Sequence, residues 1–373
     1  MTGYTAEEVI GKTPRILQGP NSDKEELARL SKALRNWETC EISTINYKKN
    51  GEEFWINFSV SPVANEKGWY THWIAIERDV TEQKNKQLEK DLLGKISLDF
   101  NIDQDLISSL NRLCNTICNY GKFDLVELWL PNIENSQIQL LACQSATSEA
   151  DIFYENSKDI KSFHLSEGLP GEVWAKTTSL LWKDIPKNDD FIRKEAAEKA
   201  GIESALGIPL FYNESVVGVL VIATHEDINF LKKHVRVFEQ LEQFIGSEIH
   251  RKRLENDLSH LYHAIPDILC LADFQGRFLK INQAGCTLLG YAEEEILYHS
   301  FDEFVHPEDK YISTNEVMKL SEGETTFNFE NRYITKSGEI IWLSWTCNSA
   351  LEEGIIYATA KNITREKNLR ELN

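Results

Sequence analysis

The sequence has little basic charge for its length and no long apolar run. Its 373 residues include 40 lysines and arginines against 59 aspartates and glutamates, a formal net charge of −19. Nucleic-acid binding needs a basic surface that neutralises phosphates, so this acidic excess argues against it. No apolar run approaches the roughly 20 residues that a membrane helix requires, and no signal segment opens the chain. We therefore expect a cytoplasmic protein that binds neither nucleic acid nor membrane.

Recognisable catalytic and metal-binding patterns are also missing. The seven cysteines contain no Cys-x-x-Cys pair, and the nine histidines are dispersed. The sequence has no P-loop, no Asp-x-Gly-x-Gly nucleotide loop, no His-Glu phosphoacceptor helix and no helix-turn-helix with a basic face. Cys114 and Cys118 lie four residues apart in an expected helix, a spacing that one buried face explains. We expect no metal site and no enzymatic centre in this chain.

What the sequence does contain is an internal repeat. The stretch "GYTAEEVI" at 3–10 matches "GYAEEEIL" at 290–297, and "NGEEFWINF" at 50–58 matches "SGEIIWLSW" at 337–345, both with one offset. Each copy then reaches a strand and a polar stop; the stops hold Asp79 and Thr81 in the first copy and Asn362 and Thr364 in the second. Repetition at one offset indicates a duplicated domain, and the chain is long enough for a third domain between the copies.

The two copies differ at their beginnings. The second copy opens with an apolar run at 268–271, a turn and an alternating run at 277–281, which together predict a β-hairpin. The first copy has no counterpart, because Met1 lies only two residues before Gly3. We expect its sheet to lack two strands and to present a bare edge. We also expect the chain to be a fragment of a longer protein, or to begin at an internal methionine.

These features resemble the PAS family, whose members are small antiparallel sheets wrapped by short helices and serve as sensor or docking modules. The resemblance rests on the hairpin, Asn282 at a helix start, "VHPED" at 305–309, the "KSGEIIW" hairpin and the closing "NIT". Within "VHPED", Pro307 and Asp309 are expected to start a helix, so His306 is interpreted as a cap and not as a catalyst.

The PAS resemblance also implies a relay and a pocket. The closing turns around Asp79, Thr81, Asn362 and Thr364 are expected to pass a signal into the helices that follow. The pocket of the second copy would be lined by some combination of Leu269, Leu271, Ile281, Leu288, Leu289, Trp342 and Trp345, a set apolar enough to be plain core. Its ligand is unknown.

The first copy resembles the light, oxygen and voltage branch of the PAS family in "GKTPRILQGPNSD" at 11–23 and "INYKKNGEEFWINFSVSP" at 45–62. That branch binds a flavin and adds a cysteine sulfur to it. Pro14 fills the cysteine's place and offers no thiol, so the adduct cannot form; Ile56 and Glu77 replace two further flavin contacts. A vestigial flavin pocket would retain Asn46, Arg15 and Gln18. We favour structural roles for these side chains and expect no required cofactor.

The middle segment predicts helix, strands, a long irregular section, two strands and a closing helix. Strands are expected at 125–130 and 138–142, a short helix ending near Lys176, and a hairpin at 206–211 and 216–223. The segment resembles a GAF domain, a second sensor module with a six-stranded sheet and a ligand pocket on one face.

Two alternatives concern the function of this GAF-like segment. Trp174 and Trp182, together with Phe191, are candidates to border a ligand pocket, with core packing as the alternative. Some GAF domains reduce free methionine sulfoxide through reactive cysteines, and the candidates here are Cys114, Cys118 and Cys143. No basic residue flanks them to favour a thiolate, so we rank this enzymatic alternative last.

Helices are expected between the domains. Leu88, Leu92 and Ile96 repeat every fourth residue, as do Leu241, Ile245 and Ile249. After the basic run at 250–253, the apolar stripe changes phase and continues through Leu254, Leu258, Leu261 and Ile265. Such stripes suit parallel helices in a homodimer, and the alternative is a helix lying on its own domain.

The expected fold class is therefore α+β, with antiparallel-sheet PAS, GAF and PAS domains joined by helical linkers. This order resembles the input half of a bacterial sensor histidine kinase whose kinase core or response-regulator pathway lies elsewhere. A free-standing regulatory adaptor and the input of a cyclic-dinucleotide enzyme are the alternatives. The expected bounds are an incomplete PAS domain at 1–82, a linker at 83–100, a GAF domain at 101–250, a linker at 251–262, a PAS domain at 263–365 and the start of an output helix at 366–373.

Overall fold

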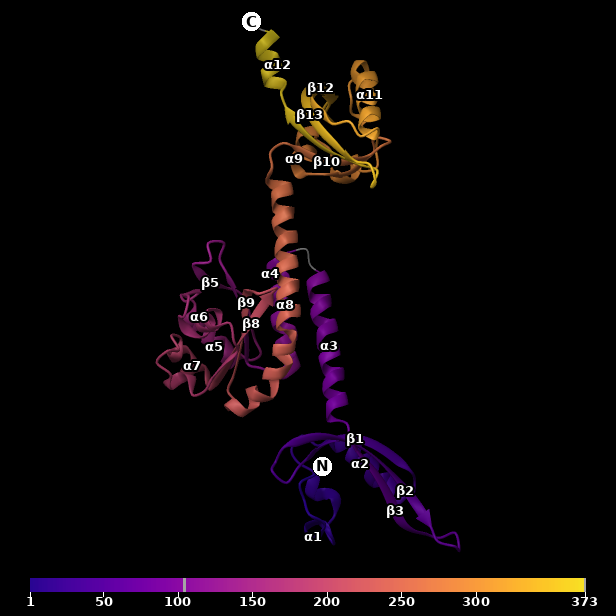
Figure 1. The fold of residues 1–373 in the computed structure, drawn as a ribbon, viewed down its shortest axis with the longest axis vertical. Coiled ribbons are helices and arrows are strands. Elements are labelled where there is room, and N and C mark those ends of the chain that lie inside the picture. The colour runs from indigo at the N-terminus through magenta and orange to yellow at the C-terminus, as the bar shows by residue number, and fades with distance from the viewer. Residues whose placement is uncertain (103–104, 372–373) are drawn as a thin grey trace. The chain divides into compact units, whose positions relative to one another are not determined.

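The structure is a computed structural model that describes residues 1–102 and 105–371. It contains three antiparallel sheets of three, six and five strands in chain order (Figure 1). The first and last sheets belong to the two copies of the repeat, and the six-stranded sheet belongs to the segment between them. This confirms the expected α+β fold class with three sheet-and-helix domains.

The first domain is built from short helices and one three-stranded sheet. Its elements are α1 (Ala6–Val9), η1 (Pro14–Leu17), α2 (Lys24–Arg35), β1 (Cys40–Tyr47), β2 (Glu53–Ala64) and β3 (Tyr70–Asp79). Asp23 begins α2 by accepting hydrogen bonds from the backbone N–H groups of Glu25 and Glu26. Burial alternates along β1, and the buried side chains Cys40 and Ile42 form one small core with α2.

One edge of the first sheet is open. Among the described residues, β3 pairs only with β2, and every β3 residue except Trp73 is exposed. The bare edge expected from the missing hairpin is therefore confirmed.

The middle domain has a six-stranded sheet in the order β6-β5-β4-β9-β8-β7. Its elements are α4 (Leu106–Gly121), β4 (Leu125–Pro131), β5 (Gln137–Ser145), α5 (Ser148–Ser157), β6 (Ser162–His164), α6 (Gly168–Lys176), β7 (Leu180–Trp182), η2 (Ile185–Lys187), α7 (Lys194–Ala200), β8 (Ser204–Tyr212) and β9 (Ser215–Thr224). The expected strands and the helix that ends at Lys176 are confirmed. The expectation of a long irregular section is wrong, because that section forms three α-helices, one 3-10 helix and two short strands.

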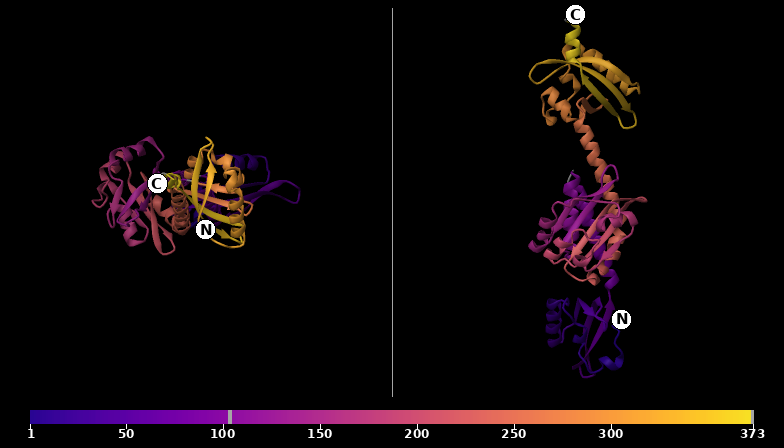
Figure 2. Two further views of the ribbon diagram at one scale, coloured as in Figure 1. Left: turned by 90° about the horizontal axis from the view of Figure 1, so that it is seen from above. Right: turned by 90° about the vertical axis from the view of Figure 1, so that its left-hand side faces the viewer.

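Two long helices accompany these domains (Figures 1 and 2). Helix α3 spans Thr81–Ile102 and buries Leu92, Ile96 and Phe100, while Leu88 is 44% exposed. Thr116 on α4 donates a hydrogen bond to Asp99 on α3, so this end of α3 packs on the middle domain. Two of the three residues of the first apolar stripe are therefore buried within this chain, as the alternative to a dimer helix predicted.

Helix α8 spans Ile228–Ala264 without a break at the basic run. Its first half packs closely on the sheet, since a Cβ added at Gly246 would lie 2.1 Å from the carbonyl oxygen of Phe211. Leu241, Ile245 and Ile249 are buried there. The second half is different: Leu254, Leu258, Leu261 and Ile265 are 37–66% exposed.

The C-terminal domain has a five-stranded sheet in the order β11-β10-β14-β13-β12. Its elements are β10 (Ile268–Asp273), β11 (Phe278–Ile281), α9 (Gln283–Leu289), α10 (Glu293–Ile296), η3 (Phe301–Glu303), η4 (Pro307–Asp309), α11 (Lys310–Ser321), β12 (Thr326–Ile334), β13 (Ile340–Ala350), β14 (Ile355–Asn362) and α12 (Thr364–Glu371). Asn282 caps α9 and His306 caps η4, each by accepting a backbone N–H, as expected.

The repeat is visible in matching local contacts. Gly3 and Gly290 share a φ of +77°, a backbone conformation that favours glycine. Glu8 pairs with Lys49 in the first domain, and Glu295 pairs with Lys336 in the C-terminal domain. Both glutamates also accept the backbone N–H three residues before them. The two domains therefore share a fold and the contacts that close its first turn.

Within the described residues, no helix combines the length and the apolar character needed to cross a membrane.

Candidate functional site

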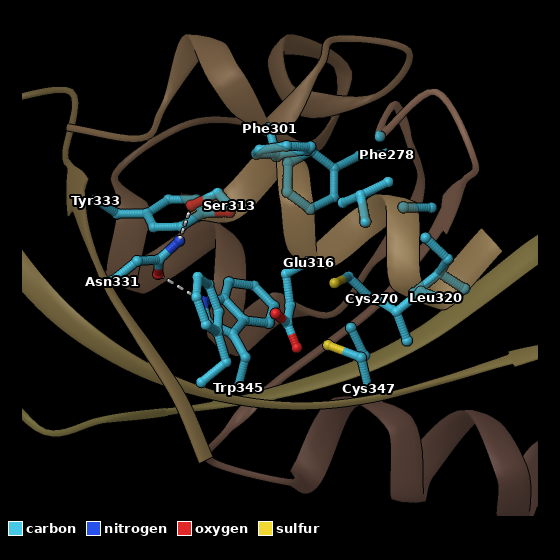
Figure 3. A pocket seen from close by; sticks show the side chains of 16 residues that line it. Cys270, Phe278, Phe301, Ser313, Glu316, Leu320, Asn331, Tyr333, Trp345 and Cys347 are labelled. Atoms are coloured by element: carbon cyan, nitrogen blue, oxygen red, sulfur yellow. Dashed lines mark hydrogen bonds between the residues drawn. The ribbon is translucent and has the colours of Figure 1, made fainter. Parts of the chain in front are cut away.

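A cavity of about 70 Å³ lies in the C-terminal domain between α11 and the inner face of the sheet (Figure 3). Its floor is a cross-strand row in which Cys270 and Cys347 both pair with Ala358 on the strand between them. The small alanine leaves space between the two thiols. Much of the remaining wall is apolar and consists of Phe278, Phe301, Val317, Leu320, Phe329 and Ile356.

Three polar residues of the wall hold one another. The Trp345 indole N–H donates to Asn331 Oδ1 at 2.9 Å, and Asn331 Nδ2 donates to Ser313 Oγ at 2.9 Å. Ser313 Oγ in turn donates to the carbonyl oxygen of Asp309 at 2.8 Å. Each of these groups has a partner within the domain, so the network fixes the shape of the wall.

Glu316 on α11 is the acidic residue of the cavity wall. Its Oε1 accepts a hydrogen bond from Thr326 at 2.7 Å, and its Oε2 lies 3.0 Å from Nζ of Lys319. The Glu316 side chain is 18% exposed and that of Lys319 is 53% exposed, so this ion pair lies at the solvent side of the cavity. In the view of Figure 3, the Glu316 carboxylate lies between Trp345 and Cys347.

The thiols of the cavity are neutral near pH 7. Burial raises the pKa of Cys347 to about 12 and raises that of Cys270 further. Burial likewise raises the pKa of the Tyr333 hydroxyl well above its ordinary value. Glu316 is the side chain of the wall that takes part in an ion pair.

The predicted lining residues lie partly in the cavity wall and partly in the core, which was the alternative given for this set. Trp345 does line the cavity, but Cys270 and Ala272 of β10 face it instead of Leu269 and Leu271. Burial alternates residue by residue along β13. Trp342 therefore lies on the opposite face of this strand from Trp345. Ile281, Leu288 and Leu289 belong to or pack against the core cluster.

Trp342 anchors the helix that leaves the C-terminal domain. Its backbone N–H donates to Thr364 Oγ1 at 2.9 Å, and its carbonyl oxygen accepts the N–H of Ile363. Lys367 Nζ lies 4.7 Å from the centroid of the Trp342 ring and also pairs with Glu330. We call Trp342, Thr364 and Lys367 the C-terminal junction. Thr364 also donates to Asn362 Oδ1 at 2.6 Å, which brings the two predicted relay residues of this turn together.

The first domain contains the same junction. The N–H of Trp55 donates to Thr81 Oγ1 at 2.9 Å, and Lys84 Nζ lies 5.4 Å from the Trp55 ring centroid. Asp79 accepts the N–H of Thr81 at 3.0 Å, and the side-chain hydrogen bond from Thr81 lowers the pKa of Asp79. Trp55, Thr81 and Lys84 form the N-terminal junction.

Sequence reasoning found the threonines of these junctions but missed the tryptophans and lysines. Trp55 and Trp342 were visible in the repeat as the shared "W" of "EEFW" and "EIIW", yet Trp55 was read only as part of a strand and Trp342 was assigned to the pocket lining. Lys84 and Lys367 each follow the junction threonine by three residues, one helical turn. Aligning the repeat past the polar stop would have revealed them.

The middle domain has a buried ion pair at its centre. Arg193, just before α7, makes two hydrogen bonds of 2.6 and 2.8 Å to Glu127 on β4, and both side chains are at most 3% exposed. The guanidinium also lies within 5.9 Å of four aromatic ring centroids: Trp129, Phe153, Phe163 and Phe191. The adjoining cavity has only about 10 Å³, close to the smallest space that holds one water.

The other predicted residues of the middle domain lie in or beside its core. Trp174 and Trp182 are half-buried and pack against the core cluster, whereas Phe191 borders the small cavity. Burial raises the pKa of Cys114 well above its ordinary value and that of Cys118 to about 11. Burial also raises the pKa of Cys143. These thiols lack the thiolate character that a reactive cysteine needs.

The predicted vestigial flavin residues differ in their exposure to solvent. Arg15 and Gln18 are exposed on and after η1, whereas Asn46 is buried on β1. Ile56, where an amide contact to flavin is expected, is 1% exposed and apolar. Together with Pro14, which offers no nucleophile, this set of side chains does not fit a flavin.

Comparisons with protein-family models agree with this division into domains. The model of the PAS domain matches residues 1–82, that of the GAF domain matches 103–250, and that of the PAS fold matches 278–359. A GAF domain from an Acinetobacter phosphoenolpyruvate-protein phosphotransferase is among the similar solved structures. It shows 23% identity, a TM-score of 0.36, and coverage of 45% of this chain and 97% of that one.

Curated relatives align with the first domain. A blue-light-activated histidine kinase of Brucella anthropi is 42% identical over 89 residues, which are 24% of this chain and 18% of the kinase. A blue-light photoreceptor of Listeria innocua is 37% identical over 89 residues, which are 24% of this chain and 35% of the photoreceptor. The matches thus span about a third or less of these relatives. The chain is a tandem sensor-domain protein in which a PAS domain, a GAF domain and a second PAS domain follow one another.

Proposed function

We propose that this chain is the sensory and signal-transducing input of a two-component sensor histidine kinase. A ligand or partner of the sensor domains changes how the connecting helices are held, and these helices pass the change to a kinase core. The named relatives include blue-light-activated histidine kinases, which supports this class of output. Light is not the proposed signal, because Pro14 replaces the photoactive cysteine and Ile56 is apolar.

The observation that carries this proposal is the junction built twice. In each PAS domain a strand tryptophan accepts and donates backbone hydrogen bonds at the start of the exit helix, and a lysine from the next helical turn covers its ring. The contacts therefore tie each exit helix to one residue of the sheet. A helix held by a few such contacts can have two positions that differ by a few kcal/mol, as signal relay requires.

Two strands connect the C-terminal cavity to this junction. On β13, Trp345 lines the cavity and Trp342 anchors α12 three residues away. On β14, Ala358 forms the cavity floor and Asn362 accepts the hydrogen bond of Thr364. A ligand that displaces either strand would therefore change the geometry at the start of α12.

The second half of α8 supports a parallel homodimer. Leu254, Leu258 and Leu261 are 50–66% exposed at steps of four and three residues, the spacing of a coiled-coil seam. The stripe before it is buried against the GAF domain, so the exposed stripe is the one available to a second copy. Sedimentation at micromolar concentration should give a dimer, and Leu258→Lys should give a monomer. Asn256→Lys, which adds the same charge on the other side of the helix, should remain dimeric.

A fusion to a kinase core tests the relay directly. If α12 is continued in register into the dimerisation helix of a histidine kinase, Lys367→Met and Thr364→Val should change autophosphorylation severalfold. Lys361→Met is the matched control, because the side chain of Lys361 is exposed and its ion pair with Glu366 is a 3.9 Å contact at the surface. Unchanged activity in both junction variants would contradict the relay and favour a free-standing adaptor or the input of a cyclic-dinucleotide enzyme.

A further inference from the structure

The charge and the size of the C-terminal cavity together restrict what it can bind. The cavity has about 70 Å³, whereas drug-sized and cofactor sites occupy roughly 300–1,000 Å³. A large planar cofactor therefore does not fit this conformation. An engineered cavity of about 150 Å³ holds benzene, so a ligand here has to be smaller than that ring or reach out through the mouth.

Glu316 is the acidic anchoring point of the wall, and the hydroxyl of Tyr333 lines the cavity as a neutral polar group. The side chains of Asn331, Ser313 and Trp345 are hydrogen-bonded to one another. A ligand would have to break one of these bonds to form its own with them. The two thiols are neutral and are weak hydrogen-bonding groups. Glu316 is different, because it is an acidic side chain; within the described part of the chain, its Oε1 accepts from Thr326 and its Oε2 lies 3.0 Å from the ammonium of Lys319.

The partner of Glu316 is easily replaced. Lys319 follows Glu316 by three residues on the same helix, and its side chain is 53% exposed. Exposed pairs of this kind contribute about 0–1 kcal/mol, since water competes for both charges. The ammonium group of a ligand can therefore take the place of Lys319 at small cost. A ligand carboxylate or phosphate would be repelled by the negative charge of Glu316.

We propose that the cavity of the C-terminal PAS domain binds a small amine, with its apolar tail among Val317, Leu320 and Phe329 and its ammonium group on Glu316. This inference rests on the proposal that this cavity receives the sensed ligand, and it adds the ligand's chemical class. The ammonium replaces Lys319 at the mouth, and the tail fills space above Ala358. A branched tail of four carbons is smaller than a benzene ring, as a cavity of about 70 Å³ requires.

Isobutylamine is the probe, and isobutanol and isovalerate are its neutral and anionic counterparts. Methyl resonances of Val317, Leu320 and Ile356 in the full chain report the titrations, to about 50 mM because so small a ligand binds weakly. Isobutylamine should saturate these shifts, isobutanol should bind about tenfold more weakly, and isovalerate should not bind, since hydrogen bonds between charged groups are roughly twice as strong as neutral ones.

Variants separate the charge from the cavity. Glu316→Gln should lower the affinity for isobutylamine about tenfold and leave the affinity for isobutanol within about twofold of the wild-type value. Lys319→Met, which removes the competing ammonium, should strengthen isobutylamine severalfold. Glu322→Gln is the matched control, because Glu322 is the C-cap residue of α11 and does not line the cavity. This substitution should leave the affinity for isobutylamine unchanged.

Two results would overturn the inference. Equal binding of isobutylamine and isovalerate, or equal affinity in the wild type and Glu316→Gln, would show that Glu316 does not select the ligand. If none of the three probes binds, the amine class is also wrong. Neither result touches the relay, because the junction variants in the kinase fusion test it without any ligand.

Discussion

Removal of one partner from the buried ion pair of the GAF domain should strongly destabilise that domain. Arg193→Met takes away the two hydrogen bonds of 2.6 and 2.8 Å and leaves the Glu127 carboxylate in a site where its side chain is 2% exposed. The remaining partner of Glu127 is the indole N–H of Trp129 at 2.9 Å. A buried pair broken on one side costs about 3–5 kcal/mol, because the uncompensated charge stays out of water.

Hydrogen exchange of the full chain can isolate this effect in one domain. Because every 1.4 kcal/mol is a factor of ten, the amides of β4 and β9 should exchange about two to four orders of magnitude faster in Arg193→Met. Amides of the PAS domains should keep their wild-type rates. The double variant Glu127→Leu with Arg193→Met removes both charges and should recover most of the protection, since apolar replacements of buried pairs are often neutral or better.

A surface pair provides the control. Lys194→Met breaks the contact with Asp189, whose side chain is 94% exposed, and should change exchange by less than about fivefold. If Arg193→Met behaved like Lys194→Met, the pair would be no more than a surface contact in energetic terms. The prediction that loss of one partner strongly destabilises the GAF domain would then be refuted.

Three further predictions concern the C-terminal PAS domain. Lys367→Met should raise amide exchange at the start of α12 by about threefold to thirtyfold, since a cation over a tryptophan is worth about 0.5–2 kcal/mol, while Lys361→Met should not. Asn331→Leu should cost about 1–3 kcal/mol in thermal or denaturant unfolding, because the Trp345 indole N–H loses its acceptor inside the wall; an unchanged midpoint would contradict the network. The hydrogen bond from Arg332 lowers the pKa of Asp309, so its stabilisation is present above the ordinary pKa near about 4 and is lost as the pH falls through the lower folded value. Asp309→Asn should therefore be less stable than the wild type at pH 7, and unfolding followed between pH 7 and pH 2 should show this difference shrinking towards acid; a constant difference would contradict the pairing.

The sequence predicted the domains well because each has strong local signals. The repeat at one offset identified both PAS domains, and Asn282 and His306 took the capping roles expected of them. The bare edge of β3 followed from the absence of two strand patterns. These predictions depend on residues that are close in sequence or on the comparison of the two repeats within the chain. No information on tertiary contacts was needed.

The site was harder to predict because its features depend on strand phase and long-range contacts. The run Ile268–Leu271 is apolar throughout, so it contains no alternation to say which side chains face inwards. The larger leucines were assigned to the pocket, but Cys270 occupies it. Glu127 and Arg193 are 66 residues apart, and no local pattern marks either as buried. The junction lysines looked like ordinary charges of a solvated helix.

The exchange rates of the first amides of α12 in Ala358→Leu give the most direct test of the central claim. The added side chain fills part of the cavity floor. Residue 358 lies on β14 and precedes Asn362, the strand's residue at the junction. Our account predicts that Ala358→Leu changes these rates severalfold in the wild-type background and leaves them unchanged in the Lys367→Met background. Rates that stay at their wild-type values while the cavity is filled would contradict a relay from the cavity to the exit helix.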